Sequence, residues 1–229
     1  MSSETLLFES IWGEAENEVH KKLVARLAPT DQDIPVFPNY NLSSQVKVMK
    51  LVEQLTDIKV PKVLWEEASI DVLGVPFFVM EQIQGRVPPD IPPYVFGGWL
   101  FDATPESQLQ LQELCVGIIA QLHQITQKSP DTDFLEFHTK GDTALKRHFT
   151  NQKEYYYWVV QDSRQHPVIE QAFDWLESHW PEESESVLSW GDARIGNIMF
   201  DSKTLEPVAV LDWEMAGLAP VEVDLGWMI

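Results

Sequence analysis

The clearest pattern of apolar and polar positions lies in the last third of the chain, where short apolar runs alternate with turn residues. Residues 187–189 predict a strand that enters a loop. Residues 197–200 and 207–211 predict two more strands, with a turn at residues 201–203 between them. Three polar residues fall at strand ends or in the loop between strands. They are Asp192, Asn197 and Asp212.

Helical spacing of apolar residues marks several earlier segments. Residues 41–55 have this spacing, and Asn41 is suited to cap the N-terminus of the helix that they predict. Residues 104–126 predict a longer helix that begins with Pro105 in its first turn. Two more helices are predicted over residues 143–161 and 166–180.

Short strands are predicted in the first half of the chain, in segments rich in β-branched and aromatic residues. These segments are residues 5–8, 22–27, 63–65 and 77–81. Residues 87–98 are rich in Pro, Gly and aromatic residues, which predicts irregular structure.

Carboxylates and an amide at strand ends are the groups that phosphoryl transfer requires. One carboxylate orients the attacking hydroxyl and accepts its proton, while an amide oxygen and a second carboxylate hold Mg²⁺ on the nucleotide phosphates. The protein-kinase catalytic loop and metal motif has an Asp, then four residues, then an Asn, and later an Asp at the end of a strand. Asp192, Asn197 and Asp212 follow this order. The alternative is that these residues serve turns and cap a strand, as Asp and Asn often do.

The segment from Gly191 to Asn197, followed by Asp212, resembles a known family. The aminoglycoside phosphotransferase and choline-kinase-like superfamily has a loop that reads His-Gly-Asp, four residues, Asn, and later an Asp-Trp-Glu-like strand end. The chain is similar in particular to the branch associated with acyl-CoA dehydrogenases. The resemblance implies that Asp192 is the catalytic base and that Asn197 and Asp212 are metal ligands.

Four further positions take expected roles from the same resemblance. Trp190 stands where the family has His, and an indole donates one hydrogen bond but neither accepts one nor carries a proton. If that His is structural, Trp190 is a tolerated replacement; if it takes part in the chemistry, activity is in doubt. Arg194 is a candidate contact to the transferring phosphate, or a solvated loop residue. Glu214 is a weaker metal candidate, and Asp224 matches an acid that braces the catalytic loop.

The nucleotide side of the site is expected in the first 83 residues. The kinase-like fold places a phosphate-binding Lys on the strand that here ends at residue 27, and this chain offers Arg26, with Lys22 as the alternative on the same strand face. Gln45 stands where a helix usually supplies a Glu that pairs with this Lys. Both members of the pair therefore differ from the family pattern.

Other nucleotide contacts are expected at the N-terminus and at the hinge between lobes. Ser2 and Ser3 are candidates for contacts to the phosphates, because they match the segment that follows the glycine-containing loop of the family. The backbone of Glu81 to Ile83 is expected to face the adenine. The resemblance also implies that the glycine loop before Met1 and several helices after residue 229 are missing from this chain.

Composition limits the function classes that are open. The chain has 16 Lys and Arg against 36 Asp and Glu, a formal net charge of −20, which argues against binding to nucleic acid or an anionic membrane. Mg²⁺ would have to carry much of the attraction for nucleotide phosphates. Cys115 is the one cysteine, so it cannot form an internal disulfide. The N-terminus lacks a signal-peptide pattern and no apolar run reaches membrane-spanning length, so we expect a soluble cytoplasmic protein.

The sequence therefore predicts an α+β, two-lobed protein-kinase-like fold, with a small antiparallel-sheet lobe and a mainly helical large lobe that lacks its C-terminal helices. The expected domains are a nucleotide-binding lobe over residues 1–83 and an incomplete catalytic lobe over residues 84–229. The expected function is phosphorylation of a small-molecule hydroxyl, with ATP or GTP and Mg²⁺. The acceptor is a hydroxyacyl thioester, a hydroxy acid, an amino alcohol or an aminoglycoside-like compound.

Two other interpretations remain open at this point. In the first, the chain is a catalytically weak or inactive nucleotide-binding relative, which Trp190, Arg26 and Gln45 would explain. In the second, it is an inert fragment without a stable fold. Oligomeric state cannot be inferred from the sequence.

Overall fold

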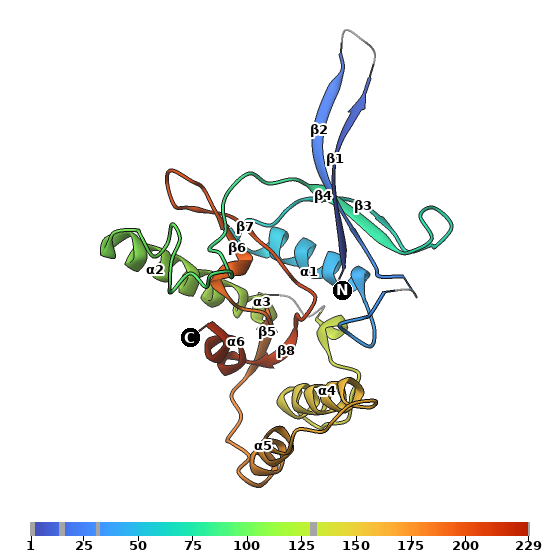
Figure 1. Ribbon diagram of the computed structural model, residues 1–229, viewed down its shortest axis with the longest axis vertical. Helices are drawn as coiled ribbons and strands as arrows, with labels where there is room; N and C mark the ends of the chain where they lie inside the picture. Colours follow the sequence, from blue (N-terminus) through green and yellow to red (C-terminus); the bar gives the residue numbers. More distant parts are fainter. Residues whose placement is uncertain (1–2, 14–16, 31–32, 129–131, 229) are drawn as a thin grey trace.

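The first half of the chain forms a four-stranded antiparallel sheet in this computed structural model, which describes residues 3–13, 17–30, 33–128 and 132–228 (Figure 1). Its strands lie in the order β1-β2-β4-β3. β1 and β2 form a long hairpin that projects from the rest of the molecule, so both strands are longer than the sequence predicted. The bounds are Glu4–Trp12 for β1, Val19–Leu27 for β2, Val63–Glu67 for β3 and Phe77–Glu81 for β4.

One helix, α1 (Leu42–Leu55), lies between β2 and β3 in the chain and packs close to the sheet (Figure 1). Asn41 caps it as predicted, because its side-chain oxygen accepts a hydrogen bond from the Ser44 N–H at 2.9 Å. Val46 and Val52, on the apolar face, have no exposed surface. The periodicity of the sequence therefore located both the start and the buried face of this helix.

The second half of the chain is mainly helical. The helices are α2 (Pro105–Leu122), α3 (Ile125–Lys128), α4 (Ala144–Val159), α5 (Pro167–Ser178) and α6 (Val221–Met228), with a short 3₁₀ helix, η1, at Asp133–Leu135. The helix predicted to run to residue 126 ends at Leu122, and a two-residue turn separates it from α3. α4 and α5 lie together at the end of the molecule opposite the β1–β2 hairpin (Figure 1).

Two small antiparallel ribbons lie between the sheet and these helices. The first pairs β5 (Ser186–Ser189) with β8 (Gly217–Pro220), and the second pairs β6 (Ile198–Phe200) with β7 (Pro207–Val210). A single 3₁₀ turn, η2 (Ile195–Asn197), precedes β6. The sequence analysis predicted β5, β6 and β7 but neither β8 nor α6. The predicted irregular segment at residues 87–98 has turns and one isolated bridge, between Asp90 and Pro93, but no helix or named strand.

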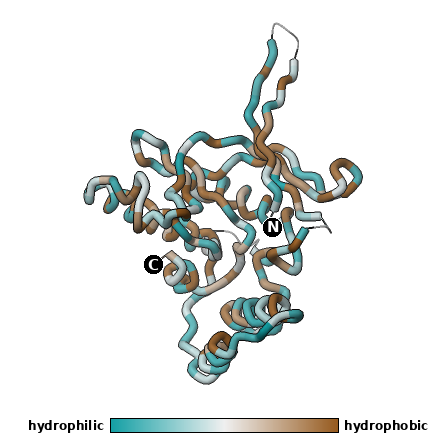
Figure 2. Tube along the Cα trace, in the orientation of Figure 1, coloured by the Kyte–Doolittle hydropathy of each residue, from teal (hydrophilic) through white to brown (hydrophobic). Residues whose placement is uncertain are grey.

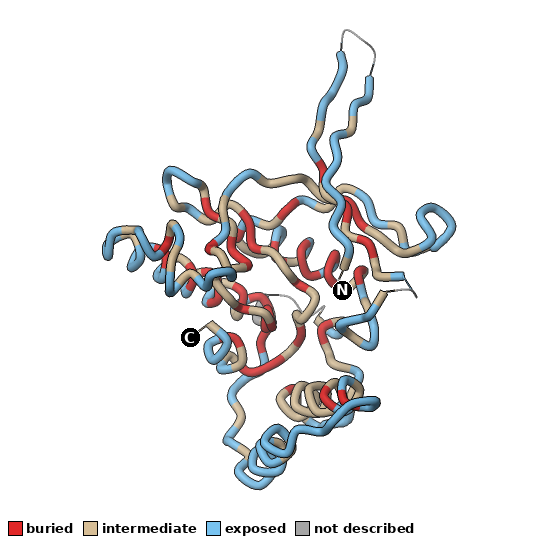
Figure 3. Tube along the Cα trace, viewed as in Figure 1, coloured by how far each residue is buried: buried red, intermediate tan, exposed pale blue. Residues whose placement is uncertain are grey.

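One large hydrophobic cluster connects the sheet side of the molecule to the helical side. It includes Val46 from α1 and Phe78 from β4, together with Leu111 from α2, Trp190 and Phe200. Figure 2 shows hydrophobic segments gathered at the centre of the trace, and Figure 3 shows the buried residues concentrated there. The predicted lobes therefore share a core, and the boundary between residues 83 and 84 stays a prediction. None of the described helices has the length and apolar character needed to span a membrane.

Candidate active site

Asp192 lies in the loop between β5 and η2, and both oxygens of its carboxylate accept hydrogen bonds. Oδ2 accepts from Asn197 Nδ2 at 2.7 Å and from Arg194 Nε at 3.2 Å. Oδ1 accepts from Trp227 Nε1 at 2.7 Å. The side chain is 15% exposed. The carboxylate is therefore held in one orientation and still reaches solvent, as a base that receives a substrate proton requires.

Asn197 ends η2 and is oriented by its own amide. Its Nδ2 donates to the backbone carbonyl of Asp192 at 3.1 Å as well as to the carboxylate. Both donated bonds use the nitrogen, so the amide oxygen remains for another partner. The spacing of four residues between Asp192 and Asn197 in the sequence corresponds to this tight turn.

Asp212 follows β7 in a left-handed backbone conformation, with φ of 60°. A non-glycine residue rarely adopts this conformation, and where it does so the surrounding structure holds it in place. Its Oδ1 is buried and has no hydrogen-bond partner among the described residues. Burial raises the pKa of this carboxyl above its ordinary value, although Arg26 acts in the opposite direction. A buried carboxylate oxygen without a partner is suited to bind a cation.

Trp190 connects the Asp192 loop to the Asp212 loop. Its side chain has no exposed surface, and its indole Nε1 donates to the carbonyl oxygens of Leu211 and Asp212, each at 3.0 Å. The ring also packs against Trp213, with 5.7 Å between ring centroids. The residue is therefore structural here: it fixes the backbone on both sides of the Asp212 position.

Asp224 braces the start of the same loop, as the sequence analysis expected. Its carboxylate accepts hydrogen bonds from the Ser189 hydroxyl and from the N–H groups of Trp190 and Gly191, at 2.8 to 3.0 Å. His123 Nε2 lies 2.9 Å from the same carboxylate. Gly191 is required by its φ of 85° and by the Met215 carbonyl, which would lie 2.2 Å from an added Cβ.

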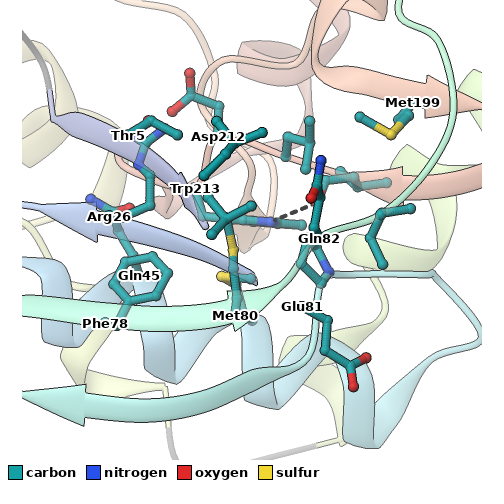
Figure 4. Close-up of a pocket in the computed structure, with 17 residues that line it drawn as sticks. Thr5, Arg26, Gln45, Phe78, Met80, Glu81, Gln82, Met199, Asp212 and Trp213 are labelled. Carbon is teal, nitrogen blue, oxygen red and sulfur yellow. Dashed lines mark hydrogen bonds between the residues drawn. The ribbon is translucent and has the colours of Figure 1, made fainter. Parts of the chain in front are cut away.

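A cavity of about 260 Å³ lies between the sheet, α1 and the β6–β7 ribbon (Figure 4). Its walls combine apolar side chains with a few polar ones, which is typical of small-molecule sites. Arg26, Gln45 and Asp212 line it, together with Met80 from β4 and Met199 from β6. Three of the residues predicted for nucleotide or metal binding thus come together at one cavity.

The hinge segment lines the same cavity but differs in detail from the prediction. The Glu81 N–H donates to the Lys62 carbonyl at 3.0 Å, and the Gln82 N–H donates to the Lys22 carbonyl at 3.1 Å. The Glu81 carboxylate points away from the cavity and pairs with Lys21 at 3.4 Å (Figure 4). Among these hinge residues, Ile83 has a backbone N–H without a partner in the described part of the chain.

Arg26 makes an ion pair that the sequence analysis did not anticipate. Its Nη2 lies 3.7 Å from Glu214 Oε2, while Gln45, the predicted partner, is buried in the same cavity wall. Burial and the nearby Asp212 raise the pKa of the Glu214 carboxyl to about 7, against the effect of Arg26. Lys22 does not line the cavity.

The two N-terminal serines contribute little to this picture. Ser2 lies outside the described residues. Ser3 has a buried hydroxyl with no hydrogen-bond partner among the described residues, and it does not line the cavity. Thr5 and Leu7 of β1 do line it. The predicted phosphate contacts of Ser2 and Ser3 therefore stay predictions.

Arg194 is fixed by two acids. Its Nη1 donates to Asp90 Oδ2 at 2.7 Å, and its Nε donates to Asp192. The bond to Asp90 raises the pKa of the guanidinium, which stays charged. The segment after the hinge is thereby tied to the catalytic loop. The phosphate contact predicted for Arg194 stays a prediction, because both of its bonds in this structure go to carboxylates.

Sequence reasoning missed Asp90 and Trp227. Their partners are 104 and 35 residues away in the chain, so no local pattern connects them. One signal in the sequence could have pointed to Trp227. It is three residues after Asp224, so the two side chains lie on one face if the segment is helical.

A second cavity of about 580 Å³ adjoins the first and shares Gln45 and Trp213 with it. It lies between the N-terminal end of α1, η1 and α4, and Glu214 is part of its wall. Asp192 does not line it. This cavity therefore offers room for a further ligand but is not where the base acts.

The donor groups fit a magnesium ion bound together with a nucleotide. No group of three or more His, Cys, Asp or Glu residues able to hold a metal occurs in the described part of the chain. Mg²⁺ commonly takes one or two protein oxygens and completes its shell with phosphates and water. Asn197 and Asp212 offer such oxygens, and the buried Oδ1 of Asp212 has no other partner.

Comparison with known proteins gives a consistent result. The sequence profile described as "Phosphotransferase enzyme family" matches residues 14–229. The human protein "Acyl-CoA dehydrogenase family member 11" is 29% identical over 188 residues, which cover 81% of this chain and 22% of that protein. The mouse "Acyl-CoA dehydrogenase family member 10" is 24% identical over 207 residues, covering 90% of this chain and 18% of that protein. The chain thus spans about a fifth of the length of these curated relatives.

Solved structures show the same fold. A putative aminoglycoside phosphotransferase from Ralstonia eutropha has a TM-score of 0.68 at 21% identity, over 97% of this chain and 63% of that one. An aminoglycoside-3'-phosphotransferase of type VIII has a TM-score of 0.57 at 15% identity, over 100% and 77% of the two chains. A ternary complex of a related phosphotransferase with ADP and hygromycin B also has a TM-score of 0.57, at 15% identity, over 96% and 70%. These similarities confirm the predicted α+β kinase-like fold.

Proposed function

The chain belongs to the phosphotransferase enzyme family, and on that premise we propose that it transfers the terminal phosphoryl group of ATP or GTP to a hydroxyl of a small molecule. The observation that carries this proposal is the arrangement of Asp192, Asn197 and Asp212. One carboxylate is oriented by three donors and reaches solvent, while the other has a buried oxygen without a partner.

Asp192 orients the acceptor hydroxyl and takes its proton. The hydroxyl oxygen forms a bond to the terminal phosphorus as the bond from that phosphorus to the bridging oxygen breaks, and the bridging oxygen leaves as part of ADP or GDP. Losing a positioned base typically lowers the rate by about 10² to 10⁴.

Asn197 and Asp212 would hold Mg²⁺ through their amide and carboxylate oxygens. When bound, the ion neutralises charge on the phosphates and helps to align them. Trp190 supports this pair because its indole fixes the carbonyls of Leu211 and Asp212. The Trp at this position is thus compatible with activity, since it performs a structural task.

The cavity of about 260 Å³ is proposed to take the nucleotide base, with the Ile83 N–H as a hydrogen-bond donor at the hinge. Arg26 is placed to meet the phosphates if it leaves Glu214, whose Oε2 lies 3.7 Å from Arg26 Nη2. Asp192 lies outside this cavity, which is consistent with separate places for nucleotide and acceptor.

Three groups of small-molecule alcohols are proposed as acceptors. The curated relatives are named as acyl-CoA dehydrogenases, which favours hydroxyacyl thioesters or hydroxy acids, and the aminoglycoside phosphotransferase among the structural neighbours favours aminoglycoside-like compounds. Amino alcohols remain in the panel because the acidic surface suits a cationic acceptor.

The test is a measurement of ADP or GDP release with this panel of acceptors, comparing wild type with Asp192→Ala. We expect acceptor-dependent release in wild type and a loss of about 10² to 10⁴ in the variant. Asp162→Ala is the matched control, because Asp162 is exposed in the turn after α4. Equal release from wild type and Asp192→Ala would overturn the assignment of the base.

A second candidate function is nucleotide binding without transfer. The ion pair between Arg26 and Glu214 favours it, because this pair occupies the cation that would otherwise meet the phosphates. Nucleotide binding in wild type together with no release for any acceptor in the panel would support this alternative.

A further inference from the structure

Trp227, near the C-terminal end of α6, donates its indole N–H to Asp192 Oδ1 at 2.7 Å. This bond joins a helix that follows β8 to the carboxylate in the loop after β5. The contact therefore points to a role at the base.

The helix α6 carries both Trp227 and Asp224, the residue that binds the backbone of the catalytic loop. Asp224 and Trp227 are three residues apart on α6, so they lie on the same face. Asp224 is fully buried and binds the backbone N–H groups of Trp190 and Gly191. One turn of α6 thus holds the backbone that precedes Asp192 and also the carboxylate of Asp192 itself.

The hydrogen bonds of Asp192 leave one oxygen position open. Oδ2 accepts two hydrogen bonds, from Asn197 and Arg194, while Oδ1 accepts one, from Trp227. Because each carboxylate oxygen offers about two acceptor sites, Oδ1 keeps one. The indole N–H prevents rotation of the carboxylate and so decides where that remaining site points.

We propose that Trp227 is a positioning residue for the base: its N–H fixes the free acceptor site of Asp192 Oδ1 toward the incoming hydroxyl. This inference rests on the proposed phosphotransferase function. It adds a residue from outside the loop to the groups that orient the base.

Kinetics test this role. Trp227→Phe keeps a ring but removes the donor, so kcat should fall about 10-fold while the acceptor KM changes less than about twofold. Trp175→Phe is the matched control, because Trp175 is a similarly exposed tryptophan on α5, and it should leave both constants unchanged.

A spectroscopic measurement tests the contact without any turnover. The indole N–H resonance of Trp227 is assigned in a ¹⁵N-labelled chain from the peak that disappears in Trp227→Phe. It should shift in Asp192→Ala, while the indole resonance of Trp175 stays in place. An unshifted Trp227 resonance, or a Trp227→Phe variant with wild-type kcat, would overturn the inference.

The two readouts distinguish failure of the inference from failure of the proposed function. A shifted resonance without turnover for any acceptor would uphold the contact and refute the phosphotransferase role, and with it the positioning role. Turnover in wild type with an unshifted resonance would uphold the function and refute the role of Trp227.

Discussion

Trp190 shows how one buried side chain can replace another when its task is to hold backbone. The resemblance implies His at this position, while here an indole N–H is shared between the carbonyls of Leu211 and Asp212. These carbonyls flank the left-handed residue that presents the proposed metal-binding oxygen. Stability and metal binding should therefore both depend on the Trp190 donor.

Replacing Trp190 with Phe tests this dependence. The change removes the donor and leaves a cavity, so the free energy of unfolding should fall by about 2–4 kcal/mol. Urea unfolding measures this value, with Trp175→Phe as a surface control. Nucleotide affinity in the presence of Mg²⁺ should fall as well, and a variant with wild-type stability and affinity would show that the two carbonyls need no donor.

At this scale the sequence predicted the residues whose partners are near in the chain. Asp192 and Asn197 were recognised from their spacing, and a hydrogen bond joins them in the structure. Their catalytic and metal-binding roles stay predictions. Trp227 and Asp90 could not be found in this way, because tertiary structure alone brings them to Asp192 and Arg194.

At the scale of elements, α6 organises the catalytic loop although it is only eight residues long. Burial alone would raise the pKa of Asp224, but the hydrogen bonds from His123, Gly191 and Trp190 outweigh that effect and hold the pKa below its ordinary value. The ionised carboxylate therefore stabilises the folded chain, and it does so through the loop that carries the base.

Asp224→Asn should lower the free energy of unfolding by about 3 kcal/mol at pH 7, because it leaves buried donors without a charged acceptor. The folded pKa is depressed, so the contribution of Asp224 is complete above its unfolded pKa of about 3.8 and is lost as the pH falls through the lower folded value. The difference between wild type and variant should thus be constant from pH 7 to 5 and shrink below about pH 4. Urea unfolding at several pH values measures it, and a difference that persists undiminished at pH 3 would contradict this account.

Helices and strands were predicted from the sequence where apolar residues recur at regular spacing, and they were missed where this spacing is absent. α1 was located by its spacing and by the Asn41 cap. β8 is the segment Gly-Leu-Ala-Pro, which has no alternation, and α6 has apolar residues interrupted by acids without a helical stripe. Packing against β5 stabilises both segments, and a local pattern cannot show that.

At the scale of the whole molecule, the net charge of −20 sets a condition on nucleotide binding. Among the described residues that line the 260 Å³ cavity, Arg26 is the one basic side chain, and Glu214 already pairs with it. The protein alone therefore offers little positive charge to the phosphates. A divalent cation at Asn197 and Asp212 would provide it, so binding of nucleotide should depend strongly on the metal.

The measurement that tests this claim most directly is the melting temperature of the 229-residue chain with ATP or GTP and Mg²⁺, each alone and together, for wild type and Asp212→Ala. Ligand stabilisation follows the ratio of free ligand to its dissociation constant. We predict a rise in melting temperature that requires nucleotide and Mg²⁺ together in wild type and is absent in Asp212→Ala. An equal rise without Mg²⁺, or a rise that persists in Asp212→Ala, would contradict the proposed metal site.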